Sequence, residues 1–139
     1  MNNILHIYTT FVYNLIKNNI NIDKKDFYSN SIPQLTIEYY INRILRYMYI
    51  ENKEEEYYVM IFSMEYINRL REHVSIDKIS IYNIIMTCIL VSYKFLCDDT
   101  YSNKYCALIG GMSLQELNQF EILLLKILDW DLNVEISSL

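Results

Sequence analysis

Residues 81–97, IYNIIMTCILVSYKFLC, decide the fold because they are apolar on nearly every side of a helix. A helix at the surface of a globular protein has one apolar face, whereas a helix that is apolar all round is covered by its neighbours. The stretch therefore predicts a central helix, with Ser80 as its N-terminal cap. Lys94 is the one charged residue within it.

Segments on both sides of this stretch carry apolar residues at helical spacing. Helices are expected at about residues 3–18, 37–48, 54–71, 103–108 and 113–129. Thr36 is a candidate N-cap, Ser113 and Glu116 have the spacing of a capping box, and Gly110-Gly111 stops the short helix. The expected fold class is all-α, with about five helices packed around a central apolar helix and an extra N-terminal helix.

Composition and charge exclude several classes of protein. The chain has 139 residues, enough for one domain, and its two glycines and one proline are too few for a turn-rich all-β protein. The net charge is −5, and no concentrated basic surface of the kind that binds nucleic acid is visible. The small basic groups, Lys24-Lys25 and Arg69 with Arg71, are expected to be solvated.

The three cysteines, Cys88, Cys97 and Cys106, lie in apolar surroundings. We expect them to be buried, reduced thiols, which fits a cytoplasmic or nuclear location. No CxxC or HxxxH spacing occurs, so no zinc site is expected. The sequence shows neither a signal peptide nor an apolar run long enough to span a bilayer, and no membrane contact is expected.

No arrangement typical of an active site is visible in the sequence. It contains no glycine-rich phosphate loop and no GxSxG motif, and it has only two histidines, His6 and His73. Asp98-Asp99 is expected to be a solvated pair in a loop. The 14 tyrosines are attributed to A/T-rich codons rather than to an aromatic binding surface. We therefore expect no catalytic residue, no cofactor and no metal.

Lys94 and Glu121 are unusual because each interrupts an apolar helix. Each could simply extend from its helix into solvent, with its aliphatic stem on the apolar surface. Alternatively, both could mark the polar centre of a surface that binds another protein. Helical periodicity alone does not separate these two interpretations.

Four stretches share an order and spacing with a known family. They are Ile32-Pro33 with IEYYINRILRYM (37–48), IFSMEYINRL (61–70), ILVSYKFLCDD (89–99) and NKYCALIGGMSLQELNQFEILLLKILDWDLNV (103–134). Together they resemble the cyclin box, and within the cyclins the phosphate-pathway type, also called PHO-, P- or U-type. The resemblance implies a single cyclin box at residues 32–135, preceded by a helix and connecting loop at 1–31 and followed by a tail at 136–139.

The resemblance also implies a function. It suggests a regulatory subunit, not itself an enzyme, that binds and activates a cyclin-dependent kinase by docking against the kinase αC helix. Lys94 and Glu121 fall on the motif positions that contact this helix in cyclins, and Phe95, Leu96 and Leu117 are weaker candidate contacts. The alternative is a cyclin-fold protein–protein adaptor without a kinase partner, which would be indifferent to charge changes at Lys94 and Glu121.

One position departs from the family pattern. Cyclins usually pair a buried arginine on the first box helix with an aspartate near the end of the second. Arg43 matches the first position, but Asn68 occupies the second. An amide can accept a hydrogen bond from the guanidinium group but supplies no opposite charge, so we expect a weaker buried pair.

Overall fold

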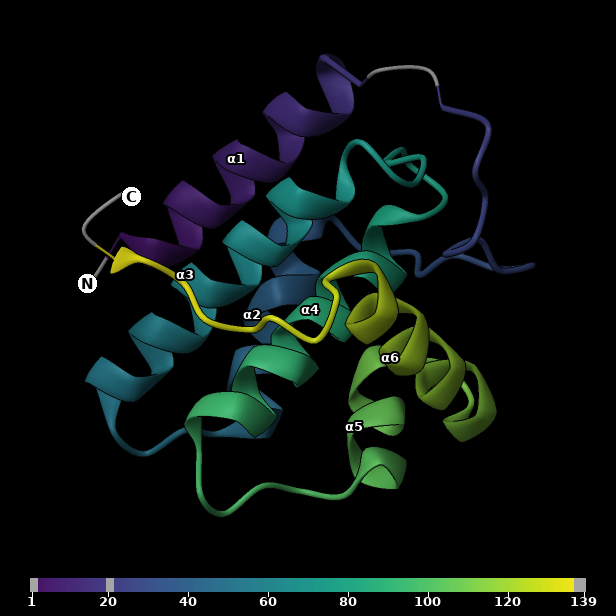
Figure 1. Ribbon diagram of the computed structural model, residues 1–139. Coiled ribbons are helices and arrows are strands. Elements are labelled where there is room, and N and C mark those ends of the chain that lie inside the picture. The colour runs from purple at the N-terminus through teal and green to yellow at the C-terminus, as the bar shows by residue number, and fades with distance from the viewer. Residues whose placement is uncertain (1–2, 20–21, 137–139) are drawn as a thin grey trace.

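The computed structural model describes residues 3–19 and 22–136, which form six helices and no strand (Figure 1). The helices are α1 (Ile4–Lys17), α2 (Ile37–Met48), α3 (Lys53–Leu70), α4 (Ile81–Leu96), α5 (Asn103–Gly110) and α6 (Leu114–Ile127). The expected all-α class is therefore confirmed. Of the expected tail, residues 137–139 lie outside the described part of the chain. None of the described helices is both long and apolar enough to cross a membrane.

Helix α4 forms the centre of the fold, as its sequence predicts. All of its residues from Ile81 to Tyr93 are buried except Tyr82, and it packs mainly against α3 and α6, with further contacts to α2 and α5. Two of its buried hydroxyl groups are satisfied within the helix, since Thr87 donates to the carbonyl of Asn83 (2.6 Å) and Ser92 to that of Ile89 (3.0 Å). Lys94 follows this buried run, in the last turn of the helix.

The N-terminal cap expected at Ser80 is not formed. The Ser80 hydroxyl instead donates to the carbonyl of Ser75 (2.7 Å) and accepts from the amide of Asp77 (3.0 Å). Asp77 performs the local capping role, because its carboxylate accepts from the amides of Ile79 (2.9 Å) and Ser80 (3.1 Å). The Tyr28 hydroxyl donates to the other oxygen of the same carboxylate. Asp77 thus fixes the turn that leads into α4.

The other predicted helix ends are confirmed. Thr36 accepts from the amide of Tyr39 (3.1 Å), and Ser113 with Glu116 forms a complete capping box. At the end of α5, Gly111 adopts φ +70°, a left-handed conformation that favours glycine. Gly110 serves a different purpose: an added Cβ would lie 2.6 Å from Cγ of Met86, so glycine lets α5 approach α4 closely.

The expected pairing of Arg43 with Asn68 is wrong. Both residues lie in the described part of the chain, and each bonds to a different partner. Arg43, on α2, donates through Nε to the carbonyl of Ile109 on α5 (3.1 Å). Asn68, on α3, donates to the carboxylate of Glu65 (3.3 Å). Helix α2 packs mainly on α5 and α1, whereas α3 packs mainly on α4, so the two side chains face different neighbours.

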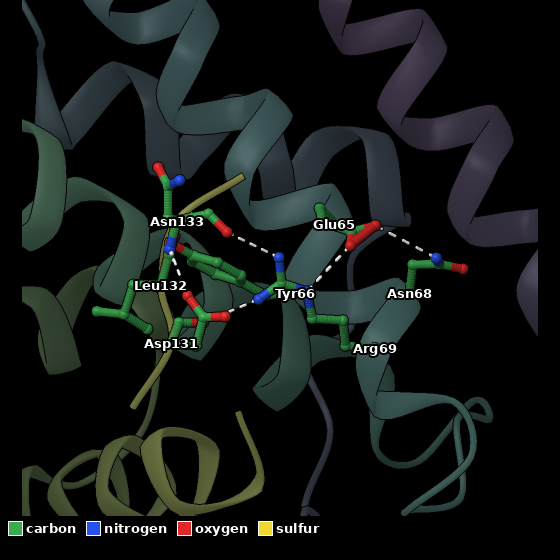
Figure 2. Close-up of polar contacts among 7 residues, drawn as sticks. All are labelled: Glu65, Tyr66, Asn68, Arg69, Asp131, Leu132 and Asn133. Atoms are coloured by element: carbon green, nitrogen blue, oxygen red, sulfur yellow. Dashed lines mark hydrogen bonds and ion pairs between the residues drawn. The ribbon is translucent and has the colours of Figure 1, made fainter. Parts of the chain in front are cut away.

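Arg69 is not simply solvated, which corrects a second expectation from the sequence (Figure 2). Its guanidinium group donates to the carbonyls of Asp131 and Asn133, both at 2.8 Å, and to the carboxylate of Glu65 at 3.0 Å. Next to it, the Tyr66 hydroxyl donates to the carbonyl of the intervening Leu132 (2.6 Å). Two neighbouring side chains of α3 therefore hold three consecutive carbonyls of the C-terminal segment.

Candidate functional site

The two charged residues that interrupt apolar helices meet at the protein surface. Lys94 Nζ lies 2.9 Å from Oε2 and 3.2 Å from Oε1 of Glu121, so one ammonium group binds both carboxylate oxygens. The Lys94 side chain is 37% exposed and that of Glu121 is 15% exposed. The pair therefore presents its ammonium group to solvent while the carboxylate is largely covered.

Asn103 completes this arrangement from a third helix. It is the first residue of α5, and its side-chain amide donates to Oε1 of Glu121 (2.9 Å) and to Oδ1 of Asn118 (2.8 Å). Glu121 is thus held by Lys94 from α4 and by Asn103 from α5, at the point where these two helices meet α6. The sequence pattern did not point to Asn103 or Asn118. The available signal was the three-residue spacing of Asn118 and Glu121 on one helix face.

The apolar candidates around the pair lie at different depths. Phe95 is 48% exposed, and its ring centroid is 6.1 Å from that of Phe62. Leu96 is half-buried against the core. Leu117, a weaker candidate contact, is completely buried, so it is a core residue and not an exposed contact. Ile122, which directly follows Glu121, is 51% exposed and was missed by the sequence analysis.

The thiols near this site are protonated at neutral pH. All three cysteines are buried and free, as the sequence predicts. Burial raises the pKa of Cys106 to about 11, with Lys94 lowering it and Glu121 raising it, and burial together with Glu55 raises the pKa of Cys97 to about 12. A thiol with so high a pKa is a poor nucleophile. Within the described ranges, no group of three or more His, Cys, Asp or Glu residues is placed to hold a metal ion.

The Lys94–Glu121 contact differs from the other ion pairs of the described chain. Lys53–Glu56 and Arg69–Glu65 are each made within one turn of α3, whereas Lys94 and Glu121 are 27 residues apart and join two helices. The family model for cyclins matches residues 13–132 of the chain.

The chain belongs to the cyclin family. Among its relatives, Cyclin-U4-3 of Arabidopsis thaliana is 31% identical over 109 residues, which cover 76% of this chain and 48% of the relative. Cyclin-P4-1 of Oryza sativa subsp. japonica is 32% identical over 103 residues, covering 73% of this chain and 47% of the relative. PHO85 cyclin-7 of Saccharomyces cerevisiae is 28% identical over 127 residues, covering 81% and 43%.

These relatives confirm the resemblance to PHO-type cyclins that the sequence motifs indicate. The cyclin described here spans about half the length of the curated relatives it matches. Its six helices, with the apolar α4 at the centre, are consistent with the cyclin-box fold.

Proposed function

We propose that the protein is a regulatory subunit that binds and activates a cyclin-dependent kinase by docking against the αC helix of the kinase. The observation that carries this proposal is the surface ion pair of Lys94 and Glu121, with the exposed ring of Phe95 next to Lys94 in sequence. Both charges stand at the motif positions that contact αC in cyclins. Membership of the cyclin family, with PHO85 cyclin-7 among the relatives, supports a kinase partner.

Stability alone gives little reason for this ion pair. A surface pair of this kind contributes only about 0–1 kcal/mol to folding, because water screens the charges and the side chains lose freedom. An ammonium group has three N–H donors, and the hydrogen bonds of Lys94 both go to the single carboxylate of Glu121. At least one donor is therefore left for an acceptor on a partner. A partner that covers the pair also removes water and strengthens these charged hydrogen bonds.

Docking at this surface would act on the kinase through the position of αC. A cyclin that holds αC inward lets the kinase align its own Lys–Glu pair and its activation loop. The kinase performs the phosphoryl transfer, and the cyclin supplies a rigid surface. The convergence of α4, α5 and α6 on Glu121 supports such a role, because the two donors fix the carboxylate from two helices.

Co-purification with candidate cyclin-dependent kinases tests the proposal. Wild type is compared with Lys94→Ala/Glu121→Ala, and kinase activity is assayed on each complex. The matched control is Glu72→Ala/Lys78→Ala, which removes the same charges from exposed positions near the opposite end of α4. Circular dichroism establishes that all variants are folded.

We expect wild type and the control variant to bind and activate the kinase, and the Lys94/Glu121 variant to lose both properties. If no kinase binds, or if the Lys94/Glu121 variant performs as well as wild type, the kinase-docking proposal fails. The cyclin-fold adaptor without a kinase partner is then the better account.

A further inference from the structure

Helices α2 and α5 share an exposed strip of aromatic and apolar side chains. On α2 its members are four residues apart, which places them on one face of the helix. The members of this aromatic strip are Tyr39, Arg43 and Tyr47 on α2, Tyr105 and Leu108 on α5, and Tyr101 in the loop before α5. Leu108 is 67% exposed and Tyr39 is 56% exposed. A contiguous exposed surface of this kind is typical of an interaction site.

Contacts between neighbouring side chains make the aromatic strip continuous. The Arg43 guanidinium lies 5.5 Å from the ring centroid of Tyr47, and the Tyr105 hydroxyl donates to the Tyr47 carbonyl (3.1 Å). The rings of Tyr105 and Tyr101 pack with their centroids 4.5 Å apart. A hollow of about 130 Å³ between the two helices is lined by Arg43, Tyr47, Tyr105, Leu108 and Ile109. These contacts hold the strip in one arrangement, which lowers the cost of ordering it against a partner.

One end of the strip carries positive charge that no neighbouring group neutralises. Arg43 is half-buried, and its Nε donates to the carbonyl of Ile109 (3.1 Å). Within the described residues, its two Nη atoms make no hydrogen bond and no carboxylate pairs with it. Three residues further along α2, Arg46 is exposed and also forms no hydrogen bond or ion pair in the described chain. Because a guanidinium group binds a carboxylate through two parallel N–H groups, this end can accept carboxylates from a partner.

The opposite end of the strip, at Tyr101, carries negative charge. Tyr101 lines a cavity of about 770 Å³ together with three exposed carboxylates, those of Glu51, Asp98 and Asp99. In the part of the chain that the structure describes, these carboxylates take part in no hydrogen bond or ion pair. Two lysines are close by in the sequence, but Lys53 is bound to Glu56 (3.5 Å) and Lys104 forms no ion pair in the described chain. The two ends of one continuous strip are therefore opposite in charge, and neither is neutralised within the chain.

We propose that the aromatic strip binds the same strip of a second copy of this chain, in a dimer with two-fold symmetry. A two-fold axis that crosses the strip at its middle lays each end of one copy against the opposite end of the other. The two arginines of each copy then meet Asp98 and Asp99 of the second copy, while the tyrosines and Leu108 meet at the centre. Tyrosine and arginine are the residue types that contribute most in such interfaces. Neither Lys94 nor Glu121 belongs to the strip, so the dimer does not depend on the proposed kinase docking.

Sedimentation equilibrium of the purified chain tests for the dimer. Over a concentration range of about 1–300 μM, we expect the apparent mass to rise from that of one chain to that of two, with a micromolar dissociation constant. A wild-type chain that remains monomeric throughout this range overturns the proposal, and the strip would then be a surface for a different protein.

Charge reversal at each end locates the interface. Arg43→Glu/Arg46→Glu makes both ends of the strip negative, and Asp98→Lys/Asp99→Lys makes both ends positive. Each variant alone is expected to be monomeric, because like charges would meet in its dimer. An equimolar mixture of the two variants is expected to form a heterodimer, since every end then meets an opposite charge. If both variants are folded by circular dichroism and their mixture stays monomeric while wild type dimerises, the proposed arrangement is overturned.

Leu108→Ser tests the centre of the interface without touching the core, because this side chain is largely exposed. It is expected to weaken the dimer by about tenfold. The matched control for the arginine variant is Lys24→Glu/Lys25→Glu, which makes the same change in net charge at exposed positions outside the strip and should dimerise as wild type does. Wild-type dimerisation by Leu108→Ser overturns the proposal. Since these measurements need no kinase, their failure leaves the proposed docking at Lys94 and Glu121 unaffected.

Discussion

Glu121 is the residue on which the proposed docking surface depends, because donors from two other helices fix its carboxylate. Lys94 binds both of its oxygens, and Asn103 binds Oε1 at 2.9 Å. A carboxylate held from two sides keeps one orientation, which is what a partner requires of a charged contact. The same geometry indicates that Asn103 positions Glu121 and does not itself have to contact the proposed kinase partner.

Replacement of Asn103 by alanine removes both of its side-chain hydrogen bonds, to Glu121 and Asn118. We expect the free energy of unfolding to fall by about 1 kcal/mol, because the contacts are partly exposed, and kinase affinity to fall several-fold. Urea denaturation and a kinase pull-down measure the two effects. Asn30→Ala, an exposed position in the loop before α2, is the control. Unchanged kinase affinity in Asn103→Ala would contradict the positioning role.

Single residues also show where sequence reasoning succeeds and where it stops. Lys94 and Glu121 could be recognised because a charge within an apolar helix breaks a local pattern. Leu117 could not be assigned, because a residue of an apolar stripe belongs to the core or to the surface according to which helix covers it. Arg69 was misjudged for a similar reason: the carbonyls it binds lie 62 and 64 residues further along the chain.

At the scale of helices and segments, the C-terminal segment depends on α3. Replacing Arg69 by alanine removes its bonds to the carbonyls of Asp131 and Asn133. We expect a loss of about 1–3 kcal/mol in the free energy of unfolding and faster amide hydrogen exchange in residues 131–136. Arg69→Lys should be intermediate, because an ammonium group does not reproduce the geometry of the guanidinium fork.

Arg71→Ala is the matched control for this prediction, since Arg71 is exposed and lies only two residues beyond Arg69. It is expected to leave both stability and hydrogen exchange close to wild type. If Arg69→Ala and Arg71→Ala have the same effect, Arg69 does not hold the C-terminal segment.

The approach of α5 to α4 gives a second prediction at this scale. Gly110→Ala places a Cβ 2.6 Å from Cγ of Met86, so we expect the free energy of unfolding to fall by about 1–3 kcal/mol. Because the clash involves Met86, Met86→Ala should partly relieve it in a double-mutant cycle. Gly111→Ala meets open space and destabilises through its left-handed backbone instead. The loss of stability caused by Gly111→Ala should therefore simply add to the loss caused by Met86→Ala. If these two losses are not additive, the assignment of the Gly110→Ala effect to a clash with Met86 is contradicted.

Most helix boundaries could be predicted because their signals are local. Thr36 and Ser113 cap the helices that follow them, since each needs only an amide three residues further on. Ser80 carried the same signal, yet Asp77 takes the capping role and the serine hydroxyl bonds to Ser75. Which of two neighbouring polar side chains caps a helix depends on the path of the loop in the folded structure. The local sequence pattern does not contain that path.

At the scale of the whole molecule, the buried thiols predict a loss of stability in alkaline solution. Burial raises the pKa of Cys106 from 9.0 to about 11 and that of Cys97 to about 12. Above pH 9 the unfolded chain therefore releases protons that the folded chain retains, and the free energy of unfolding falls as pH rises. Urea denaturation at pH 7, 8.5 and 10 measures this, with a decrease expected between the last two values.

A variant with Cys97 and Cys106 replaced by alanine is the comparison for this prediction. It is less stable at neutral pH because of the lost packing, but its stability should decline less steeply between pH 8.5 and 10. An equally steep decline in both proteins would assign the alkaline effect to other groups, of which the buried Cys88, Tyr8 and Tyr40 also have raised pKa values.

The measurement that tests the central claim most directly is kinase affinity after exchange of the two charges. Lys94→Glu/Glu121→Lys restores an ion pair between α4 and α6, but it presents the opposite arrangement of charge to a partner. We predict that this double variant stays folded, with stability near that of wild type, and loses kinase binding and activation as Lys94→Glu alone does. If the exchanged variant binds and activates the kinase as wild type does while Lys94→Glu fails, the pair has only a structural role, and the docking account is contradicted.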